Sequence, residues 1–170
     1  TASVAIDTFN ELQHLGYHAK IIQLTAKEKL CLCEEMDCNP VNCPYAKGHF
    51  DRVNDAVFDL LHRCEMIERD DILSQADRYT VCPFELCLDT ASWCDNVICD
   101  YNYVFDPNVY LKRFFQEGIK GDYIFLIDEA HNMVERSRQM YSAQIYKEDF
   151  LTVKRIMKEH SRSIEKALEK

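Results

Sequence analysis

The sequence of 170 residues predicts a helix-rich α/β fold, and three observations carry that prediction. A helical pattern followed by a short apolar run opens the chain, a cysteine-rich stretch interrupts it, and apolar runs typical of strands return afterwards. With 47% hydrophobic residues, the chain is able to bury a core.

The chain is expected to open with a helix and a strand. Between Ser3 and Leu15 the residues at 4, 9, 12 and 15 are apolar and recur at helical spacing, and Gly16 is a typical C-terminal stop. Residues 20–25 read KIIQLT, which indicates a short strand. A helix followed by a strand is typical of an α/β layer.

Residues 26–92 differ in character and are expected to form an insertion. Cysteines and prolines punctuate residues 31–45, and a helix is predicted from Asp51 to Cys64. The apolar face of that helix comprises Val53, Ala56, Val57, Leu60, Leu61 and Cys64.

The α/β pattern returns after the insertion. Residues 97–99 indicate a strand, and Asp106-Pro107 is a typical N-cap and first residue of a helix that should end near Gly118. The run YIFLID at 123–128 is predicted to be a buried parallel strand. A long helix is predicted over 147–170, with a coiled-coil-like seam at positions 150, 153, 157, 160, 164 and 167.

Charge and cysteine content limit the class of protein. A formal charge of -9 is the wrong sign for a domain that binds nucleic acid by neutralising phosphates, so any DNA contact must be local or supplied by other regions. No stretch approaches the roughly 20 apolar residues that span a bilayer, and the N-terminus lacks the features of a signal peptide. We therefore expect a cytoplasmic protein without membrane contact, in which nine cysteines indicate a metal or cluster rather than disulfides.

The tetrapeptide Asp128-Glu129-Ala130-His131 follows the predicted strand at 123–128. In a nucleotide hydrolase the first acid helps to hold Mg2+ and a neighbouring acid orients the attacking water. A chance tetrapeptide at a strand end is the alternative. The glycines at 16, 48, 118 and 121 fit no phosphate-binding loop, so this chain should not bind ATP in the usual way by itself, and we interpret it as a fragment of a larger protein.

Four cysteines lie in loop-like surroundings, and two of them precede proline: Cys31, Cys38, Cys43 and Cys82. Four thiolates suit either a 4Fe-4S cluster or a structural zinc, and their long, uneven spacing favours iron and sulfur. Cys64 and Cys99 lie on apolar faces and should be inert. Three further cysteines lie near the candidates and could replace one of them: Cys33, Cys87 and Cys94.

The order of motifs resembles that of the iron-sulfur helicases of the XPD and DinG type. The motifs are KEKLC, a cysteine-rich loop, CPFELCLD, CDNVICDYNYVFDP and YIFLIDEAHNM. The resemblance implies a partial RecA-like motor domain with an inserted, mainly helical 4Fe-4S domain and the first helix of a helical arch. The implied boundaries are 1–26 for the motor domain, 27–95 for the cluster domain, 96–137 for the return to the motor with its DEAH box, and 138–170 for the arch.

The string CNPVNCPYAKGHFDR at 38–52 is similar to a bacterial DinG-like branch of that family. The resemblance implies that Cys31 and Cys82 are the first and last cluster ligands, with Cys38 and Cys43 between them. It also implies that Asp128 holds Mg2+, that Glu129 acts on the water, and that His131 couples nucleotide state to DNA binding. The full-length parent would be an ATP-dependent helicase, moving 5' to 3', that acts on single-stranded or forked DNA in repair or replication.

Two further segments have alternative interpretations. Lys47, His49 and Arg52 could form a basic patch that touches phosphates, or a solvated surface patch. Aromatic residues in 101–105 could stack on bases or pack between domains.

Two rival hypotheses for the whole chain are a zinc-stabilised nucleic-acid-binding module and an interaction domain with an incidental DEAH sequence.

Overall fold

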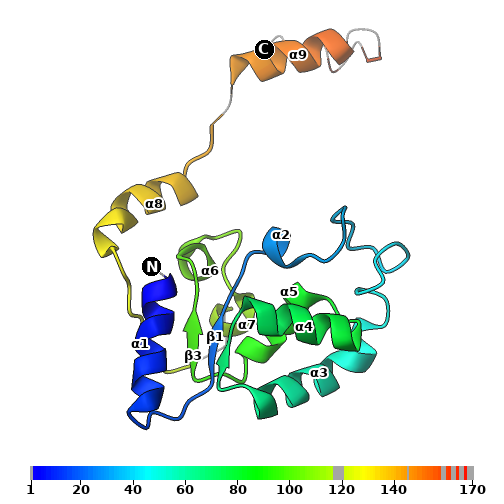
Figure 1. The fold of residues 1–170 in the computed structure, drawn as a ribbon. Coiled ribbons are helices and arrows are strands. Elements are labelled where there is room, and N and C mark those ends of the chain that lie inside the picture. Colours follow the sequence, from blue (N-terminus) through cyan, green and yellow to red (C-terminus); the bar gives the residue numbers. More distant parts are fainter. Residues whose placement is uncertain are drawn as a thin grey trace. The chain divides into compact units, whose positions relative to one another are not determined.

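The computed structural model describes residues 2–116, 121–144, 146–157, 160, 161, 164 and 167. The chain divides into two compact units, Thr1–Asp128 and Glu129–Lys170. Figure 1 labels their helices and strands. No described helix is long and apolar enough to cross a membrane.

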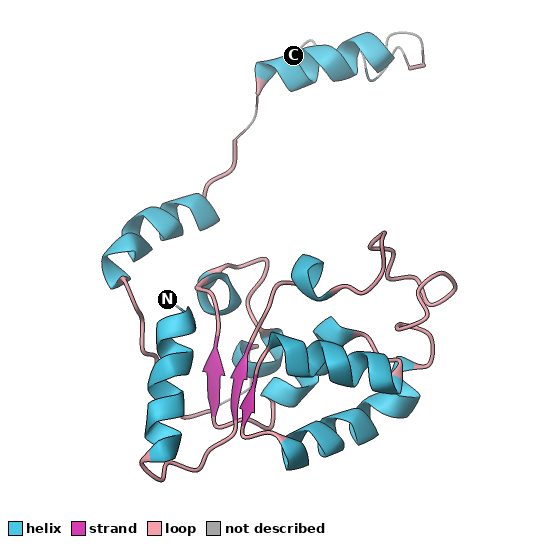
Figure 2. Ribbon diagram, viewed as in Figure 1, coloured by secondary structure: helices cyan, strands magenta, loops and turns pink. Residues whose placement is uncertain are grey.

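Three short parallel strands form the sheet of the first unit (Figure 2): β1 (Ile21–Gln23), β2 (Met66–Ile67) and β3 (Asn96–Ile98). Their order is β2-β1-β3, and Ile21 pairs with Met66 on one side and Asn96 on the other. The central position of β1 explains its apolar sequence, because Ile21 and Ile22 are fully buried. The strands predicted at 20–25 and 97–99 are confirmed, whereas β2, with two residues, is too short for a periodicity signal.

The helix predicted at 3–15 is confirmed as α1 (Ala2–His14), which contacts β3. It ends before Gly16, whose φ of 93° lies in the left-handed region that glycine adopts readily. No side chain of α1 is buried, and Leu15 is 83% exposed. Its apolar pattern therefore predicts the helix correctly but contributes little to the core of this unit.

Four helices lie between β1 and β3: α2 (Lys27–Leu30), α3 (His49–Arg63), α4 (Arg69–Tyr79) and α5 (Pro83–Ala91). The helix predicted at 51–64 is confirmed as α3, with Val53, Ala56, Val57 and Leu60 buried. Helices α3, α4 and α5 contact one another and lie side by side in Figure 1. Their buried residues form one core cluster with Ile22, Leu24 and Leu111.

Of the helix predicted from Asp106-Pro107 to Gly118, only Lys112–Phe115 is helical among the residues that the structure describes. The chain instead forms two single-turn helices, α6 (Asn102–Phe105) and α7 (Lys112–Phe115). The Asp106 carboxylate accepts a bond from the Asn108 amide (2.8 Å), and the Leu111 amide donates to the Tyr103 carbonyl (2.9 Å). The Asp106 carboxylate competes with the helical backbone bond and favours a turn. The Leu111 amide then bonds the chain back to α6. Residues 117–120 lie outside the described residues.

The buried strand predicted at 123–128 is also wrong. Residues 121–127 have no assigned strand structure, and Ile124 and Leu126 are 91% and 90% exposed. Tyr123 and Phe125 contact the ring of Phe115, with centroids 5.5 and 6.0 Å away. An apolar run becomes a buried strand only beside a neighbour that accepts its backbone hydrogen bonds, and this run pairs with none of the three described strands.

The second unit contains a 3-10 turn, η1 (Ala130–Asn132), followed by α8 (Met133–Met140) and α9 (Lys147–Met157). The helix predicted at 147–170 is confirmed as far as Met157. His160 and Ser161 form a turn, since both of their amides donate to the Met157 carbonyl. The last two positions of the predicted seam, Ile164 and Ala167, are helical and exposed, whereas most residues around them lie outside the described residues.

Candidate functional site

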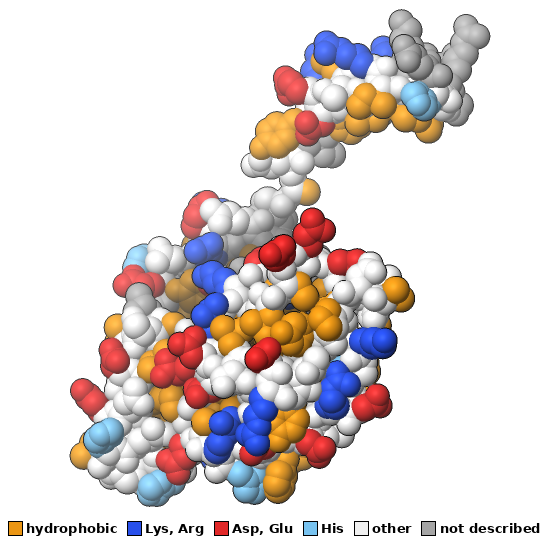
Figure 3. All heavy atoms as spheres, turned by 45° about the vertical axis from the view of Figure 1, so that its right-hand side comes forward, with side chains coloured by type: hydrophobic (Ala, Val, Ile, Leu, Met, Phe, Trp, Pro, Cys, Tyr) orange, Lys and Arg blue, Asp and Glu red, His pale blue; other side chains and the backbone are white. Residues whose placement is uncertain are grey.

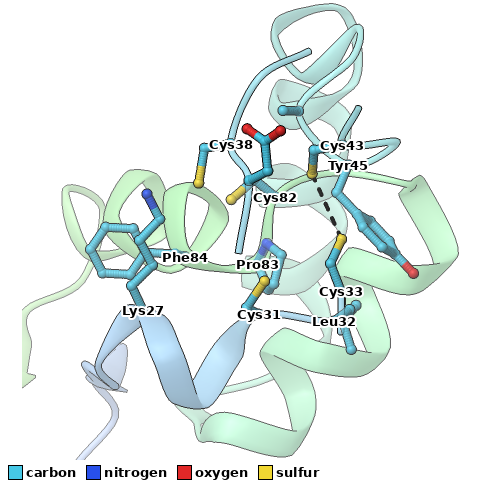
Figure 4. A pocket seen from close by; sticks show the side chains of 12 residues that line it. Lys27, Cys31, Leu32, Cys33, Cys38, Cys43, Tyr45, Cys82, Pro83 and Phe84 are labelled. Atoms are coloured by element: carbon cyan, nitrogen blue, oxygen red, sulfur yellow. Dashed lines mark hydrogen bonds between the residues drawn. The ribbon is translucent and has the colours of Figure 1, made fainter. Parts of the chain in front are cut away.

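Five cysteines, four from the loop between α2 and α3 and one from the start of α5, line one pocket of the first unit (Figure 4). Cys31 and Cys33 follow α2, Cys38 and Cys43 belong to the loop before α3, and Cys82 immediately precedes α5. All four predicted cluster ligands are therefore brought together, along with Cys33. Whether they hold a cluster remains a prediction.

Polar turns shape the loop that carries Cys38 and Cys43. The Asp37 carboxylate accepts bonds from the Asn39 amide (3.1 Å) and the Asn42 side chain (2.6 Å), the latter contributing most to the lowered pKa of Asp37. The Cys43 amide donates to the Asn39 carbonyl at 2.8 Å. Asx turns of this kind satisfy the backbone without a helix or strand, so the cysteines lie on irregular but hydrogen-bonded chain.

Cys82 is positioned by the start of α5 and by a buried histidine. Pro83 occupies the first turn of α5, where a missing N–H costs nothing. The Cys82 amide donates to Nδ1 of His49 at 3.2 Å, and His49 is only 4% exposed. Burial raises the pKa of the Cys82 thiol and lowers the pKa of the His49 ring. The backbone that carries the Cys82 thiol is thus bonded to a side chain of α3.

The sulfur atoms of Cys33 and Cys43 are 3.9 Å apart. Burial raises the pKa of the Cys33 thiol to about 11, with further contributions from Cys43 and Cys31. In the part of the chain that the structure describes, no three His, Cys, Asp or Glu side chains are close enough to hold a single metal ion. The pocket therefore gathers thiols without forming a tight tetrahedral ion site.

The wall of the pocket also contains a cation and a ring that the sequence analysis missed. Lys27 Nζ lies 5.7 Å from the centre of the Phe84 ring, an arrangement that favours a cation. The pKa of Lys27 is raised, chiefly by a hydrogen bond with the Cys38 side chain. The basic residues before Cys31 in KEKLC are the only sequence signal for this contact.

The remaining cysteines lie away from the pocket and pack against the core. Cys87 is 1% exposed, and burial raises its pKa to about 11. Burial likewise raises the pKa of Cys94 to about 12 and that of Cys99 to about 11. Cys64 is partly buried against the same core cluster. Among the three undecided cysteines, only Cys33 lines the pocket.

Neither interpretation of Lys47, His49 and Arg52, a patch that touches phosphates or a solvated surface patch, holds for all three residues. Arg52 donates to the carbonyls of Tyr79 (2.9 Å), Lys47 (2.7 Å) and Thr80, so its guanidinium ties α3 to the end of α4. His49 is buried. In Figure 3 the Lys and Arg side chains on the visible face lie among acidic ones rather than in one basic stripe. A spacing argument cannot distinguish a cation that binds phosphate from one that binds carbonyls.

The aromatic segment at 101–105 makes contacts within the first unit. The Tyr101 hydroxyl donates to the Asp128 carbonyl, and Tyr103 packs against the core cluster. Burial raises the pKa of the Tyr103 hydroxyl. Tyr103 thus packs within the first unit, and neither stacking on bases nor packing between domains is tested by these contacts.

The DEAH residues are exposed and span the division between the two units. Asp128 ends the first unit, whereas Glu129 and His131 begin the second. His131 Nδ1 lies 3.3 Å from Glu129 Oε2, with side chains 74% and 60% exposed, so this contact contributes little to stability. Glu129 has a φ of 49°, a left-handed conformation that costs a non-glycine residue about 1–2 kcal/mol. Such strain is frequent at functional turns.

Comparisons with known proteins cover most of the chain. The DEAD_2 family model matches residues 3–150. Regulator of telomere elongation helicase 1 from Homo sapiens is 21% identical over 160 residues, which cover 88% of this chain and 13% of that protein. The Bos taurus protein of the same name is 19% identical over 182 residues, or 98% of this chain and 15% of that protein. Fanconi anemia group J protein homolog from Gallus gallus is 29% identical over 76 residues, or 45% of this chain and 6% of that protein. The aligned regions thus cover 15% or less of each of these relatives.

Proposed function

The chain belongs to the DEAD_2 family, and from that premise we propose that it forms the cluster-binding and DEAH-box part of an ATP-dependent superfamily-two DNA helicase. The observation that carries the proposal is the gathering of five thiols, from the loop between α2 and α3 and from the start of α5, around one pocket. The similarity to regulator of telomere elongation helicase 1 supports the same activity.

The proposed cofactor is a 4Fe-4S cluster held by Cys31, Cys38, Cys43 and Cys82. Thiolates are the usual ligands of such clusters, and the pocket supplies them from irregular loops and a helix N-terminus. A cluster is a larger body than one metal ion, so its ligands need not converge as tightly as those of zinc. When bound, it would tie the loop at 31–45 to the start of α5 and thereby stabilise the fold.

The proposed nucleotide chemistry rests on the DEAH segment. Asp128 would help to hold Mg2+, Glu129 would orient the attacking water, and His131 would couple nucleotide state to DNA. ATP and Mg2+ would be bound jointly with the rest of the helicase chain, because the 170 residues contain no phosphate-binding loop. We further propose a bacterial DinG-like parent that moves 5' to 3' on single-stranded or forked DNA in repair or replication.

Metal analysis of anaerobically purified protein tests the cluster directly. We expect iron and acid-labile sulfide in equal amounts, about four of each per chain, and a brown colour. Serine at any one of the four ligand positions should remove both, whereas Cys64→Ala and Cys99→Ala should retain them because these side chains only pack against apolar neighbours. Full iron content in Cys82→Ser protein would contradict the assignment.

A zinc-stabilised, noncatalytic module is the second candidate, and one distance favours it. Four sulfurs at the usual Zn–S distance of about 2.3 Å lie about 3.8 Å apart along each tetrahedral edge, close to the 3.9 Å between Cys33 and Cys43. The same metal analysis separates the two candidates: one zinc per chain without sulfide would support the module and overturn the cluster.

A further inference from the structure

Cys33 is a fifth thiol in a pocket for which the proposed cluster needs four. It is partly buried on the pocket wall, and its sulfur lies 3.9 Å from that of Cys43, a proposed ligand (Figure 4). This is about van der Waals contact between two sulfurs. The two cysteines lie in one loop, ten residues apart in the sequence.

We propose that Cys33 and Cys43 form a reversible disulfide when the cluster is absent, with a small oxidised disulfide such as oxidised glutathione as the oxidant. Formation of the bond concerns only the two thiols. Its consequence, that Cys43 is withheld from the cluster until the bond is reduced, rests on the proposed function.

The surrounding chain allows the sulfurs to close. A disulfide bond is about 2.05 Å long, so the two sulfurs must approach by a little less than 2 Å. All side chains from Glu34 to Asn42 are exposed, and the nearby turn is held by bonds among Asp37, Asn39 and Asn42. The loop can therefore shift as a unit without removing a core side chain.

The exchange balances in atoms and electrons. One protein thiolate attacks a sulfur of oxidised glutathione, the S–S bond of glutathione breaks, and one glutathione leaves as its thiolate. The second protein thiolate then attacks the mixed disulfide, forms the Cys33–Cys43 bond and releases the second glutathione. The protein loses two electrons and two protons, and both glutathiones are reduced and protonated. A dithiol reductant reverses the sequence.

A disulfide at this position would protect a ligand thiol. Thiols left by a lost cluster are otherwise open to irreversible oxidation to sulfinic and sulfonic acids. The disulfide stops at a reversible state and returns Cys43 to the ligand set on reduction. It would also make cluster insertion dependent on reductant.

The first test maps the bond in metal-free protein. After treatment with oxidised glutathione, the free thiols should fall by two from nine, and digestion without reductant should yield one peptide pair linking Cys33 and Cys43. Cys33→Ser should lose the link, and Cys64→Ser should keep it as the matched control. A link between Cys43 and a different cysteine, or glutathione retained on Cys43, would overturn the proposal.

The second test measures metal uptake from ferrous iron and sulfide without added dithiol. Oxidised wild-type protein should take up no cluster until dithiol is added, while identically treated Cys33→Ser protein should take it up at once. Loss of iron binding by fully reduced Cys33→Ser would identify Cys33 as a ligand and overturn the proposal. If wild-type protein fails to bind iron in either state, the proposed cluster fails, while the peptide map still decides the disulfide.

Discussion

The buried ring of His49 accepts a hydrogen bond from the backbone amide of Cys82, with 3.2 Å between Nδ1 and N. The proton of the neutral ring is then on Nε2, which lies 3.9 Å from the Asp89 carboxylate. One side chain at the start of α3 thereby positions the cysteine that begins α5. The contact connects packing of the helical layer with the geometry of the thiol pocket.

Substitution of His49 tests this connection. His49→Ala leaves the Cys82 amide without its acceptor, which should lower the free energy of unfolding by about 1–3 kcal/mol. It should also reduce iron retention, because the Cys82 backbone is no longer held. Urea unfolding and iron analysis measure the two effects. The control is His62→Ala, at an exposed position of the same helix, and equal losses in both variants would contradict a specific role for His49.

The backbone of Thr80 is strained, so replacement by glycine should stabilise the fold. Its φ of 52° is left-handed, which costs a non-glycine residue about 1–2 kcal/mol and is especially unfavourable for a β-branched side chain. After the entropic cost of glycine is subtracted, Thr80→Gly should raise the free energy of unfolding by about 0.5–1 kcal/mol. Thermal unfolding measures the gain. Ser74→Gly, at an exposed position inside α4, should instead destabilise, and a gain in both variants would exclude relief of strain as the cause.

Asp59 should make stability depend on acidity. Its pKa is lowered chiefly by the bond from Gln75 (3.0 Å), and Arg78, 2.8 Å away, also favours the charged form. The unfolded chain, with an ordinary aspartate pKa of about 3.9, binds the proton first, so stability falls as the pH falls from there through the lower folded value.

The advantage of wild type over Asp59→Asn should accordingly be largest at neutral pH and shrink below about pH 4. Urea unfolding at pH 7 and at pH 3 measures it. Asp55→Asn, at an exposed position of α3, should leave the acid dependence of the wild type in place. A constant difference between wild type and Asp59→Asn at both pH values would contradict the prediction.

The isolated chain should not hydrolyse ATP. Its sequence lacks a phosphate-binding loop, so the DEAH residues have no bound nucleotide on which to act. A phosphate-release assay with and without single-stranded DNA measures this. DNA-stimulated turnover that disappears in Glu129→Gln would show that the chain is itself a complete motor.

In the full-length parent, different substitutions should affect strand separation and ATP hydrolysis differently. If the proposed cluster supports the surface that splits the duplex, Cys82→Ser should abolish unwinding and leave some basal ATPase activity. Asp128→Asn should remove both, since Mg2+ neutralises charge that develops on the phosphates. Fork-unwinding and ATPase assays on the same two proteins make the comparison. Robust unwinding by cluster-free Cys82→Ser protein would reduce the cluster to a dispensable element of the fold.

Sequence periodicity predicted two elements of the first unit whose apolar positions are buried in its core. The helix at 51–64 and the strand at 20–25 were recognised because their apolar residues are buried in the same core cluster. The same reasoning failed for 123–128, since an apolar run does not specify which strand accepts its backbone bonds. It also failed after Asp106, whose carboxylate bonds the Asn108 amide and favours a turn.

The sequence by itself determined that thiols lie on irregular, proline-punctuated backbone, because turn-forming residues act over a few positions. Only the tertiary structure decided which five of the nine cysteines meet, since Cys82 joins Cys31 and Cys43 through the packing of α3 and α5. It also decided that the His49 ring accepts a bond from a backbone amide and that Arg52 donates to backbone carbonyls. Long-range packing assigns partners to polar groups, and spacing along a chain does not contain that information.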